Sequence, residues 1–346
     1  MTKPTDMSET GEIHRVLVAG ASGFIGQRLV EHLANMGCDV ACLVRESSDQ
    51  TTLKKLNVKI VVGDLSEPTS ILAGMDRIDT VFNLAGTTKA LHRSQFDEVN
   101  VHGARNIALA CSKQDEPPVL VHVSSLAAAG ASEDLYVRKE ADPLHPVSDY
   151  GKSKLAGEEA VRSLANQLPL SIVRPPIVLG PGDRDGFEMF RGIQRWGVHL
   201  VPGFQPDRYS VIHVDDLCES LIAVARAGQR ATQQDLDSGV YFATLSELPT
   251  YAELGHMIAR SLGKEQAKII QIPLRTLRIV AGANQLISKL RGRPHILNLD
   301  KAREAAAGSW VCSSQKLIRD TGIQFNIGLQ QRLDQTSQWY RDNGWF

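Results

Sequence analysis

Three residues of this sequence have types and spacings that suit proton transfer to a carbon-bound oxygen. Tyr150 and Lys154 are four residues apart in a stretch that is predicted to be helical, so both side chains lie on one face. A phenol ordinarily has a pKa near ~10, but a neighbouring ammonium favours the phenolate, which can exchange a proton with an alcohol or carbonyl group. Ser125 ends the apolar run PVLVHVSS, where a hydroxyl can stabilise charge on a substrate oxygen, and Ser124 is expected to support the turn.

A glycine-rich turn predicts a dinucleotide site. The segment GASGFIG follows the strand-like RVLVA and precedes QRLVEHLANMG, whose apolar spacing is helical. Glycines let the backbone turn tightly and approach a pyrophosphate, which rests on the amide groups of the helix terminus. The residues of this turn expected to contact the cofactor are Gly20, Ser22, Gly23, Phe24, Ile25 and Gly26.

Cofactor choice is decided at the end of the second predicted strand, about 20 residues after the glycines. An acidic residue there would bind the adenosine ribose hydroxyls, but this sequence has Val44 and then Arg45. A guanidinium can hold a 2′-phosphate by paired, charge-assisted hydrogen bonds. NADP is therefore predicted over NAD, which stays as the alternative, and Ser47 or Ser48 can assist Arg45.

Short apolar runs that alternate with helical stretches must position these residues. Such runs are typical of strands buried on both faces, and the alternation predicts an α/β, Rossmann-type doubly wound parallel sheet with a smaller, mostly helical substrate lobe. We expect a disordered tail at residues 1–12. An NADP-binding domain is expected at 13–176 plus about 210–245, and the substrate lobe at about 177–209 plus 246–346.

The composition excludes several functions. With 38 basic and 39 acidic residues, the chain has no bulk charge that would hold a nucleic acid. Its five cysteines form no CxxC pair, and neither a metal site nor a disulfide framework is predicted. No apolar stretch is long enough for an integral membrane segment. These features predict a cytoplasmic protein with a small-molecule substrate.

Together the motifs resemble the extended branch of the short-chain dehydrogenase/reductase family, which belongs to the NAD-dependent epimerase/dehydratase superfamily. The local motifs are most similar to dihydroflavonol reductase-like and 3β-hydroxysteroid dehydrogenase-like members. The resemblance implies that Ser125, Tyr150 and Lys154 are catalytic, that Lys154 also holds the nicotinamide ribose, and that the protein is a homodimer. Further cofactor contacts implied by the resemblance are Asp64, Leu65, Leu84, Ala85, Gly86, Pro175 and Ile177.

Three functions are compatible with these motifs. The first is a hydride transfer between NADP(H) and a secondary alcohol or ketone of a small hydrophobic substrate. The second is epimerisation or dehydration of a nucleotide sugar with internal recycling of the cofactor. Members of that class usually have an asparagine after the sixth-strand arginine and an arginine before the V-D-D motif, whereas this chain has Pro175 after Arg174, and Tyr209 with Arg208 one place off. The third is a non-catalytic NADP-binding sensor.

Residues 272–297 mix apolar and basic side chains in a pattern typical of an amphipathic helix. Packing on the protein itself is the first interpretation of this segment, as a lid over a greasy substrate or as an ordinary surface helix. The alternative is that the protein is peripheral to a membrane, with this segment on the bilayer surface.

Overall fold

A computed structural model of the chain describes residues 12–133, 136–295 and 297–346. The tail predicted at 1–12 lies outside the described residues except for Glu12. Seven parallel strands form the main sheet in the order β3-β2-β1-β4-β5-β6-β10. They are β1 (Arg15–Ala19), β2 (Asp39–Val44), β3 (Lys59–Val62), β4 (Thr80–Asn83), β5 (Val119–Val123), β6 (Leu170–Arg174) and β10 (Val240–Phe242). The strand order reverses between β1 and β4, and in such sheets ligands bind beyond the carboxyl ends of the strands at this point.

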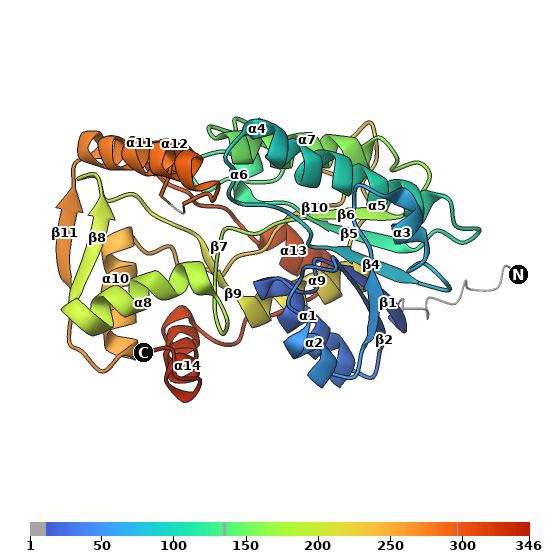
Figure 1. Cartoon of the computed structure of the whole chain (residues 1–346), viewed down its shortest axis with the longest axis horizontal. Helices are drawn as coiled ribbons and strands as arrows, with labels where there is room; N and C mark the ends of the chain where they lie inside the picture. Colours follow the sequence, from blue (N-terminus) through green and yellow to red (C-terminus); the bar gives the residue numbers. More distant parts are fainter. Residues whose placement is uncertain (1–11, 134–135, 296) are drawn as a thin grey trace, which may run out of the picture.

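Helices cover both faces of the sheet (Figure 1). They are α1 (Phe24–Asn35), α2 (Thr51–Lys55), α3 (Pro68–Leu72), α4 (Arg93–Asp97), the π-helical η1 (Glu98–Gly103), α5 (Ala104–Ser112), α6 (Leu126–Ala129), α7 (Asp149–Arg162), α9 (Val214–Ala227) and α13 (Gln315–Thr321). The doubly wound parallel sheet predicted from the alternating pattern is confirmed.

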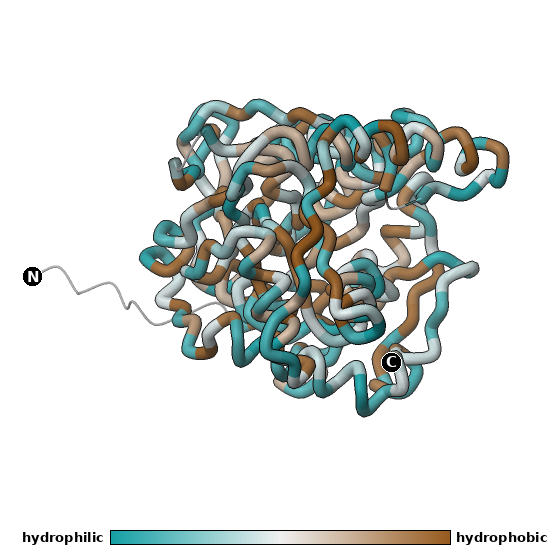
Figure 2. Tube along the Cα trace, turned by 90° about the vertical axis from the view of Figure 1, so that its left-hand side faces the viewer, coloured by the Kyte–Doolittle hydropathy of each residue, from teal (hydrophilic) through white to brown (hydrophobic). Residues whose placement is uncertain are grey.

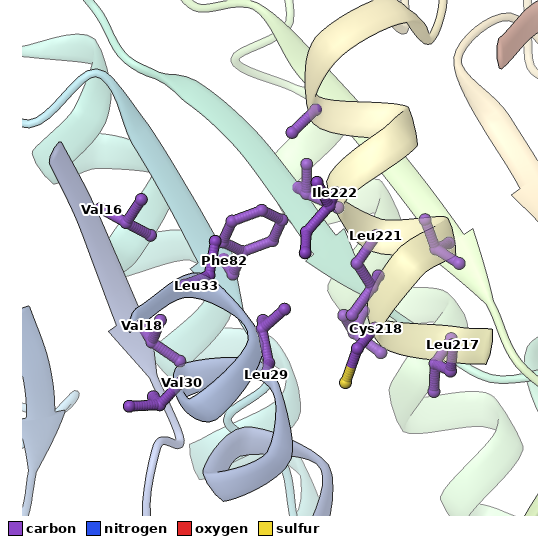
Figure 3. Close-up of a cluster of buried hydrophobic side chains, with 14 of the residues drawn as sticks. Val16, Val18, Leu29, Val30, Leu33, Phe82, Leu217, Cys218, Leu221 and Ile222 are labelled. Carbon is purple, nitrogen blue, oxygen red and sulfur yellow. The ribbon is translucent and has the colours of Figure 1, made fainter. Parts of the chain in front are cut away.

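The central strands are apolar on both faces because each face is covered by helices. Hydrophobic positions accordingly run through the strands at the centre of the chain trace, and hydrophilic positions dominate many outer turns (Figure 2). On one face, Val16 and Val18 of β1 and Phe82 of β4 pack against α1 and α9, as Figure 3 shows. On the other face, strand residues such as Leu17 pack against α3, α5 and α7.

A second, smaller lobe lies beside the sheet. It contains α8 (Arg184–Trp196), β8 (Val198–Pro202), α10 (Tyr251–Ser261), β11 (Lys268–Ile272), α11 (Leu274–Arg291), α12 (Leu299–Ala305) and α14 (Leu329–Asp342). Strands β8 and β11 form a two-stranded parallel ribbon, and the apolar faces of α8, α10 and α14 pack together. The lobe is mostly helical, as predicted.

Two features of this part of the chain are not indicated by the apolar pattern of the sequence. The stretch after Gly180 contains the whole of α8, which begins after the cap residue Asp183 and ends at the left-handed Gly197. The short β9 (Val211–His213) pairs with β7 (Ile177–Leu179) in a separate ribbon, and the edge strand of the main sheet is β10.

The division into two domains stays a prediction, and one helix from the segment of the substrate lobe packs on the cofactor domain. α13 belongs to the segment assigned to the substrate lobe, yet it contacts α9 and β10, and its Leu317 joins the apolar cluster under the main sheet. Among the described residues, no helix is long and apolar enough to cross a bilayer.

Candidate active site

The glycine turn after β1 is packed too closely for side chains. A methyl group added at Gly26 would lie 2.1 Å from the carbonyl oxygen of Gly20, and one at Gly20 would lie 2.7 Å from the backbone nitrogen of Ala85. Gly20 also has φ +82°, a conformation that favours glycine. The turn thus packs the start of α1 against the end of β1, and the end of β1 against the chain after β4. An amide-lined cradle of this kind fits a dinucleotide pyrophosphate.

The other predicted residues of this turn lie around the cradle. Ser22 accepts a hydrogen bond from Gln27 through its carbonyl oxygen, and α1 begins at Phe24 after its cap residue Gly23. Phe24 lies near Gly182 of the loop after β7, while Ile25 packs on the core beneath the sheet.

The chain after β4 connects the cradle to the helix of Tyr150. Leu84 donates its backbone N–H to Ala19, and a methyl group added at Gly86 would lie 3.7 Å from Nζ of Lys154. Asn100 ties this segment to α7: its amide donates to the Ser153 hydroxyl at 2.8 Å, and its side-chain oxygen accepts the N–H of Thr87 at 2.9 Å. The chain therefore brings together Ala85, Gly86 and Lys154 at the carboxyl ends of the strands.

Arg45 follows β2 and is exposed, as expected for a residue that binds a phosphate at the rim of the site. Asp64 lies at the end of the neighbouring β3, and its carboxylate accepts hydrogen bonds from the N–H and hydroxyl of Ser66. Those hydrogen bonds, aided by the charge of Arg45, lower the pKa of Asp64. Leu65 is held by Asn106, whose amide donates to the Leu65 carbonyl at 2.7 Å. The carboxylate of Asp64 is thus partly engaged in its own turn.

Ser125 and Tyr150 face each other at the carboxyl end of β5. Ser125 caps α6, where its hydroxyl accepts the N–H of Ala127 at 3.1 Å, and Tyr150 lies in the first turn of α7. α6 and α7 approach closely because Gly151 has no side chain: an added methyl group would lie 2.4 Å from the carbonyl oxygen of Ala127. Burial raises the pKa of the Tyr150 phenol, and the Ser125 hydroxyl and the Lys301 ammonium act in the opposite direction.

Lys154 is buried beneath this pair. Its ammonium donates to the carbonyl oxygen of Val123 at 2.8 Å, and burial lowers its pKa to about 8 although Glu158 acts against that shift. The neighbouring Ser124 hydroxyl is buried and has no hydrogen-bond partner in the described part of the chain. Leaving a buried hydroxyl without a partner costs free energy, and a ligand that bonded to Ser124 would remove that cost.

α12 of the second lobe clamps the start of α7. The Asp300 carboxylate accepts the N–H groups of Asp149 and Tyr150 at 2.7 and 3.0 Å. Lys301 places its Nζ 5.2 Å from the centre of the Tyr150 ring and pairs with Glu304 at 2.7 Å. The cation that faces the tyrosine ring therefore comes from residue 301, which the sequence motifs did not indicate.

Ser125 and Tyr150 line a cavity of about 360 Å³ between the sheet edge and the second lobe. Its walls are largely apolar and aromatic, and their charged members are Lys301 and Glu304, which form an ion pair. The other lining residues are Thr88, Leu126, Ala127, Pro176, Ile177, Pro202, Tyr209, Ser210, Tyr251, Ala305 and Trp310.

The residues that follow β6 have two different roles. Pro175 accepts the N–H of Leu126 through its carbonyl oxygen at 2.8 Å and so braces the turn that carries Ser125. Ile177 lines the cavity. Arg174, before them, is buried in an ion pair with Glu158 and does not reach the cavity.

Arg208 and Tyr209 point to different places. The Arg208 guanidinium donates to the carbonyl oxygen of Leu248 at 2.7 Å and lies 3.8 Å from the Glu253 carboxylate. Tyr209 lines the cavity instead. The position before the V-D-D motif thus presents a phenol rather than a guanidinium to the substrate space.

His213, Asp215 and Asp216 have structural partners. His213 is the N-cap of α9: the helix begins at Val214, so Asp215 lies in its first turn. Asp215 pairs with Arg28, and Asp216 pairs with Arg332. Within the described residues, no group of three or more His, Cys, Asp or Glu side chains could hold a metal ion.

Comparison with known proteins identifies the family. The sequence model of the NAD-dependent epimerase/dehydratase family matches residues 16–237. The chain belongs to this family. It is 31% identical to the ceramide reductase of Caulobacter vibrioides over 332 residues, which are 95% of this chain and 95% of that protein. It is 26% identical to a putative dihydroflavonol 4-reductase of Synechocystis, over 95% of each chain.

Solved structures of the epimerase/dehydratase family share the fold. The dTDP-glucose 4,6-dehydratase of Streptomyces venezuelae, crystallised with NAD bound, superposes with a TM-score of 0.77 at 20% identity and covers 96% of this chain and 98% of its own. The family match and the 31% identical reductase show that the chain is an NAD(P)-dependent oxidoreductase of the extended short-chain dehydrogenase/reductase type, as its motifs predicted.

Proposed function

We propose that this family member is an NADP(H)-dependent reductase that interconverts a ketone and a secondary alcohol on a hydrophobic substrate. The observation that carries the proposal is the cavity itself: Ser125 and Tyr150 are on one wall, and apolar and aromatic side chains make up most of the others. An apolar cavity with a few convergent polar groups orients a greasy substrate by its single reactive oxygen. The similarity to a ceramide reductase, whose name describes reduction of a lipid, agrees with this proposal.

In ketone reduction, the substrate oxygen lies between the Ser125 and Tyr150 hydroxyls. Bound NADPH supplies the hydride to the carbonyl carbon. Tyr150 donates its proton to the oxygen, so the C=O double bond becomes an alcohol, and Ser125 donates a hydrogen bond to the charge that develops there. Because burial raises the pKa of Tyr150, the phenol keeps its proton at neutral pH and can act as the acid.

Two cations stabilise the tyrosinate that this step leaves behind. Lys154 lies one helical turn further along α7, and Lys301 lies over the ring at 5.2 Å. A cation over an aromatic face is worth about 0.5–2 kcal/mol. The proton lost from Tyr150 is then regained from solvent before the next turnover.

NADP is proposed as the cofactor because the residue after β2 is Arg45. A carboxylate at this position would repel a 2′-phosphate, whereas a guanidinium can bind it. Beyond the carboxyl ends of the strands, the glycine cradle at Gly20 and Gly26 would hold the pyrophosphate, and Gly86 and Lys154 would face the nicotinamide ribose. The homodimer inferred from the family resemblance is also a proposal.

A nucleotide-sugar reaction is the weaker candidate. A nucleotide sugar carries a diphosphate, which requires cations in the substrate space. In this cavity the charge of Lys301 is balanced by its ion-pair partner Glu304, and the guanidinium of Arg208 is held at Leu248 outside it. The lining therefore has no net positive charge to offer a diphosphate.

The test is a substrate screen with the purified protein. NADPH and NADH are titrated first, and absorbance of the reduced nicotinamide is then followed with long-chain and sterol ketones and with nucleotide sugars. We expect NADPH to be consumed with apolar ketones by the wild type and not by Tyr150→Phe. Tight cofactor binding with conversion of a sugar and no net NADPH consumption would contradict the proposal.

A further inference from the structure

Helix α11 carries an apolar stripe that faces solvent. Leu277, Ala281 and Ser288, spaced by four and seven residues, are buried against the protein. Ile279, Leu286 and Leu290 have the same helical spacing on the opposite side, and their side chains are 73%, 64% and 81% exposed. Val280 and Ile287 beside them are each 44% exposed. A surface helix normally turns polar residues outward, so this outward stripe is unusual for a helix that contacts water alone.

Basic residues run along one flank of this stripe. Arg275, Arg278 and Lys289 are exposed and are spaced by three and eleven residues, which places them along one side of the helix. Between Gln266 and Leu299 the sequence has six lysine and arginine residues and no aspartate or glutamate. The ion pairs of the described residues include none of the three flanking cations. The helix therefore combines an exposed apolar face with local positive charge.

The ribbon next to α11 extends the apolar surface. Leu200 of β8 and Ile270 of β11 are opposite each other in the strand pairing and are 53% and 40% exposed. Ile272, two residues after Ile270 and so on the same side of the strand, packs into the cluster beneath α11. Ile270 therefore lies on the side of the ribbon that meets α11, and Figure 1 shows the two elements adjoining.

We propose that this α11 surface docks the protein on an anionic lipid bilayer. Apolar side chains on an amphipathic helix insert at the level of the headgroups, and flanking arginines and lysines bind acidic lipids. A second copy of the chain fits less well, because a two-fold contact would bring the same patch, with its unneutralised cations, against itself. Docking is separate from the proposed function, since it is measured as binding and not as turnover.

The location of the surface gives docking a consequence for the site. α11 packs on α12 through the cluster that contains Leu277 and Ala302, and α12 supplies Lys301, Glu304 and Ala305 to the cavity wall. Docking would hold the substrate cavity one helix away from the bilayer. A hydrophobic substrate that partitions into the membrane would then be presented close to the cavity.

The experiment is flotation of the full-length protein with vesicles of phosphatidylcholine and phosphatidylglycerol, compared with phosphatidylcholine alone. The wild type is expected to float with the anionic vesicles at low salt and to be released by high salt. Leu286→Gln with Leu290→Gln should lower the partition at least about ten-fold, because each exposed leucine contributes apolar burial. Arg275→Gln, Arg278→Gln and Lys289→Gln together should lower it by roughly 100-fold.

Matched controls remove the same side chains elsewhere. Leu236→Gln replaces a leucine that is 67% exposed in the loop before β10, and Lys54→Gln with Lys55→Gln removes exposed cations from α2. Both controls should bind as the wild type does, and all variants should keep NADPH binding and thermal midpoint. The proposal is overturned by a wild type that binds no vesicles or binds both kinds equally. It is also overturned by α11 variants that bind normally, or by an oligomer that the α11 substitutions dissociate in the absence of vesicle binding.

Discussion

The two walls of the candidate site are built in different ways. The cofactor wall comes from three segments that each carry a short local motif: the glycine turn after β1, the end of β4 and the start of α7. Its geometry is tight, since methyl groups at Gly20 or Gly26 would overlap backbone atoms. The substrate wall is assembled from β5, the loop at Tyr209, and α12 with Trp310, which are far apart in sequence. Its lining is apolar and leaves a cavity of about 360 Å³.

This difference shows which properties a short motif can encode. A pyrophosphate cradle depends on backbone shape, so the residues that form it must be glycines at fixed spacing. A cavity for an apolar substrate depends on volume and side-chain chemistry, which many residue combinations provide. The two walls should therefore respond separately to substitution, except at Tyr150, where they meet.

The largest expected effect is at this meeting point. Tyr150→Phe keeps the ring over which Lys301 lies and removes the proton donor, so ketone reduction should fall by roughly a thousand-fold while NADPH still binds. Tyr136→Phe is the matched control because Tyr136 is exposed and bonds to Asp142 away from the site. Steady-state rates and a cofactor titration measure both variants. A near-normal kcat in Tyr150→Phe would show that another group donates the proton.

A substitution on the cofactor wall should change cofactor choice alone. Arg45→Glu replaces a phosphate-binding guanidinium with a carboxylate, so the ratio of kcat/KM for NADPH over NADH should fall roughly 100-fold. The KM for the ketone should be unchanged. Arg105→Glu, at an exposed position of α5, is the control. An unaltered cofactor ratio in Arg45→Glu would remove the argument for NADP.

The pH dependence of reduction should report Lys154. Burial lowers its pKa to about 8, so the fraction of charged Lys154 falls as the pH rises through that value. The pKa of Tyr150 is raised above its usual value, so the phenol keeps its proton over the same range. We expect kcat/KM for reduction to decline about ten-fold per pH unit above pH 8. In Lys154→Arg the decline should move to higher pH, because a guanidinium stays charged. A decline at the same pH in this variant would exclude Lys154 as its source.

The smallest expected effect is on the substrate wall. Lys301 lowers the pKa of Tyr150, so Lys301→Met should raise that pKa further. Alcohol oxidation requires the tyrosinate, and its rate near pH 8 should fall roughly five-fold, with the rising limb of the pH profile displaced upward. Lys301→Arg should keep the wild-type profile. If methionine and arginine gave identical profiles, charge at position 301 would not act on Tyr150.

The sequence indicated the strands and helices that carry the candidate cofactor wall, but it did not indicate how the substrate wall is assembled. The strands formed by RVLVA and PVLVHV, the helix of Tyr150 and the parallel sheet follow local apolar periodicity, which the sequence carries directly. Lys301 and Glu304 were missed because they reach the site only when α12 docks on α7, a contact between residues about 150 positions apart in the sequence. The pairing of β9 with β7 was missed for the same reason, since a short apolar run does not specify its partner. The predicted catalytic and cofactor roles stay predictions.

Following the hydride itself tests the proposed ketone reduction most directly. The protein is incubated with an apolar ketone that it turns over and with NADPH deuterated at C4 of the nicotinamide, in both hydride positions. We predict one deuterium on the carbinol carbon of the product for each NADPH consumed. A converted nucleotide sugar with no net loss of NADPH, and no deuterated alcohol from any ketone, would contradict it.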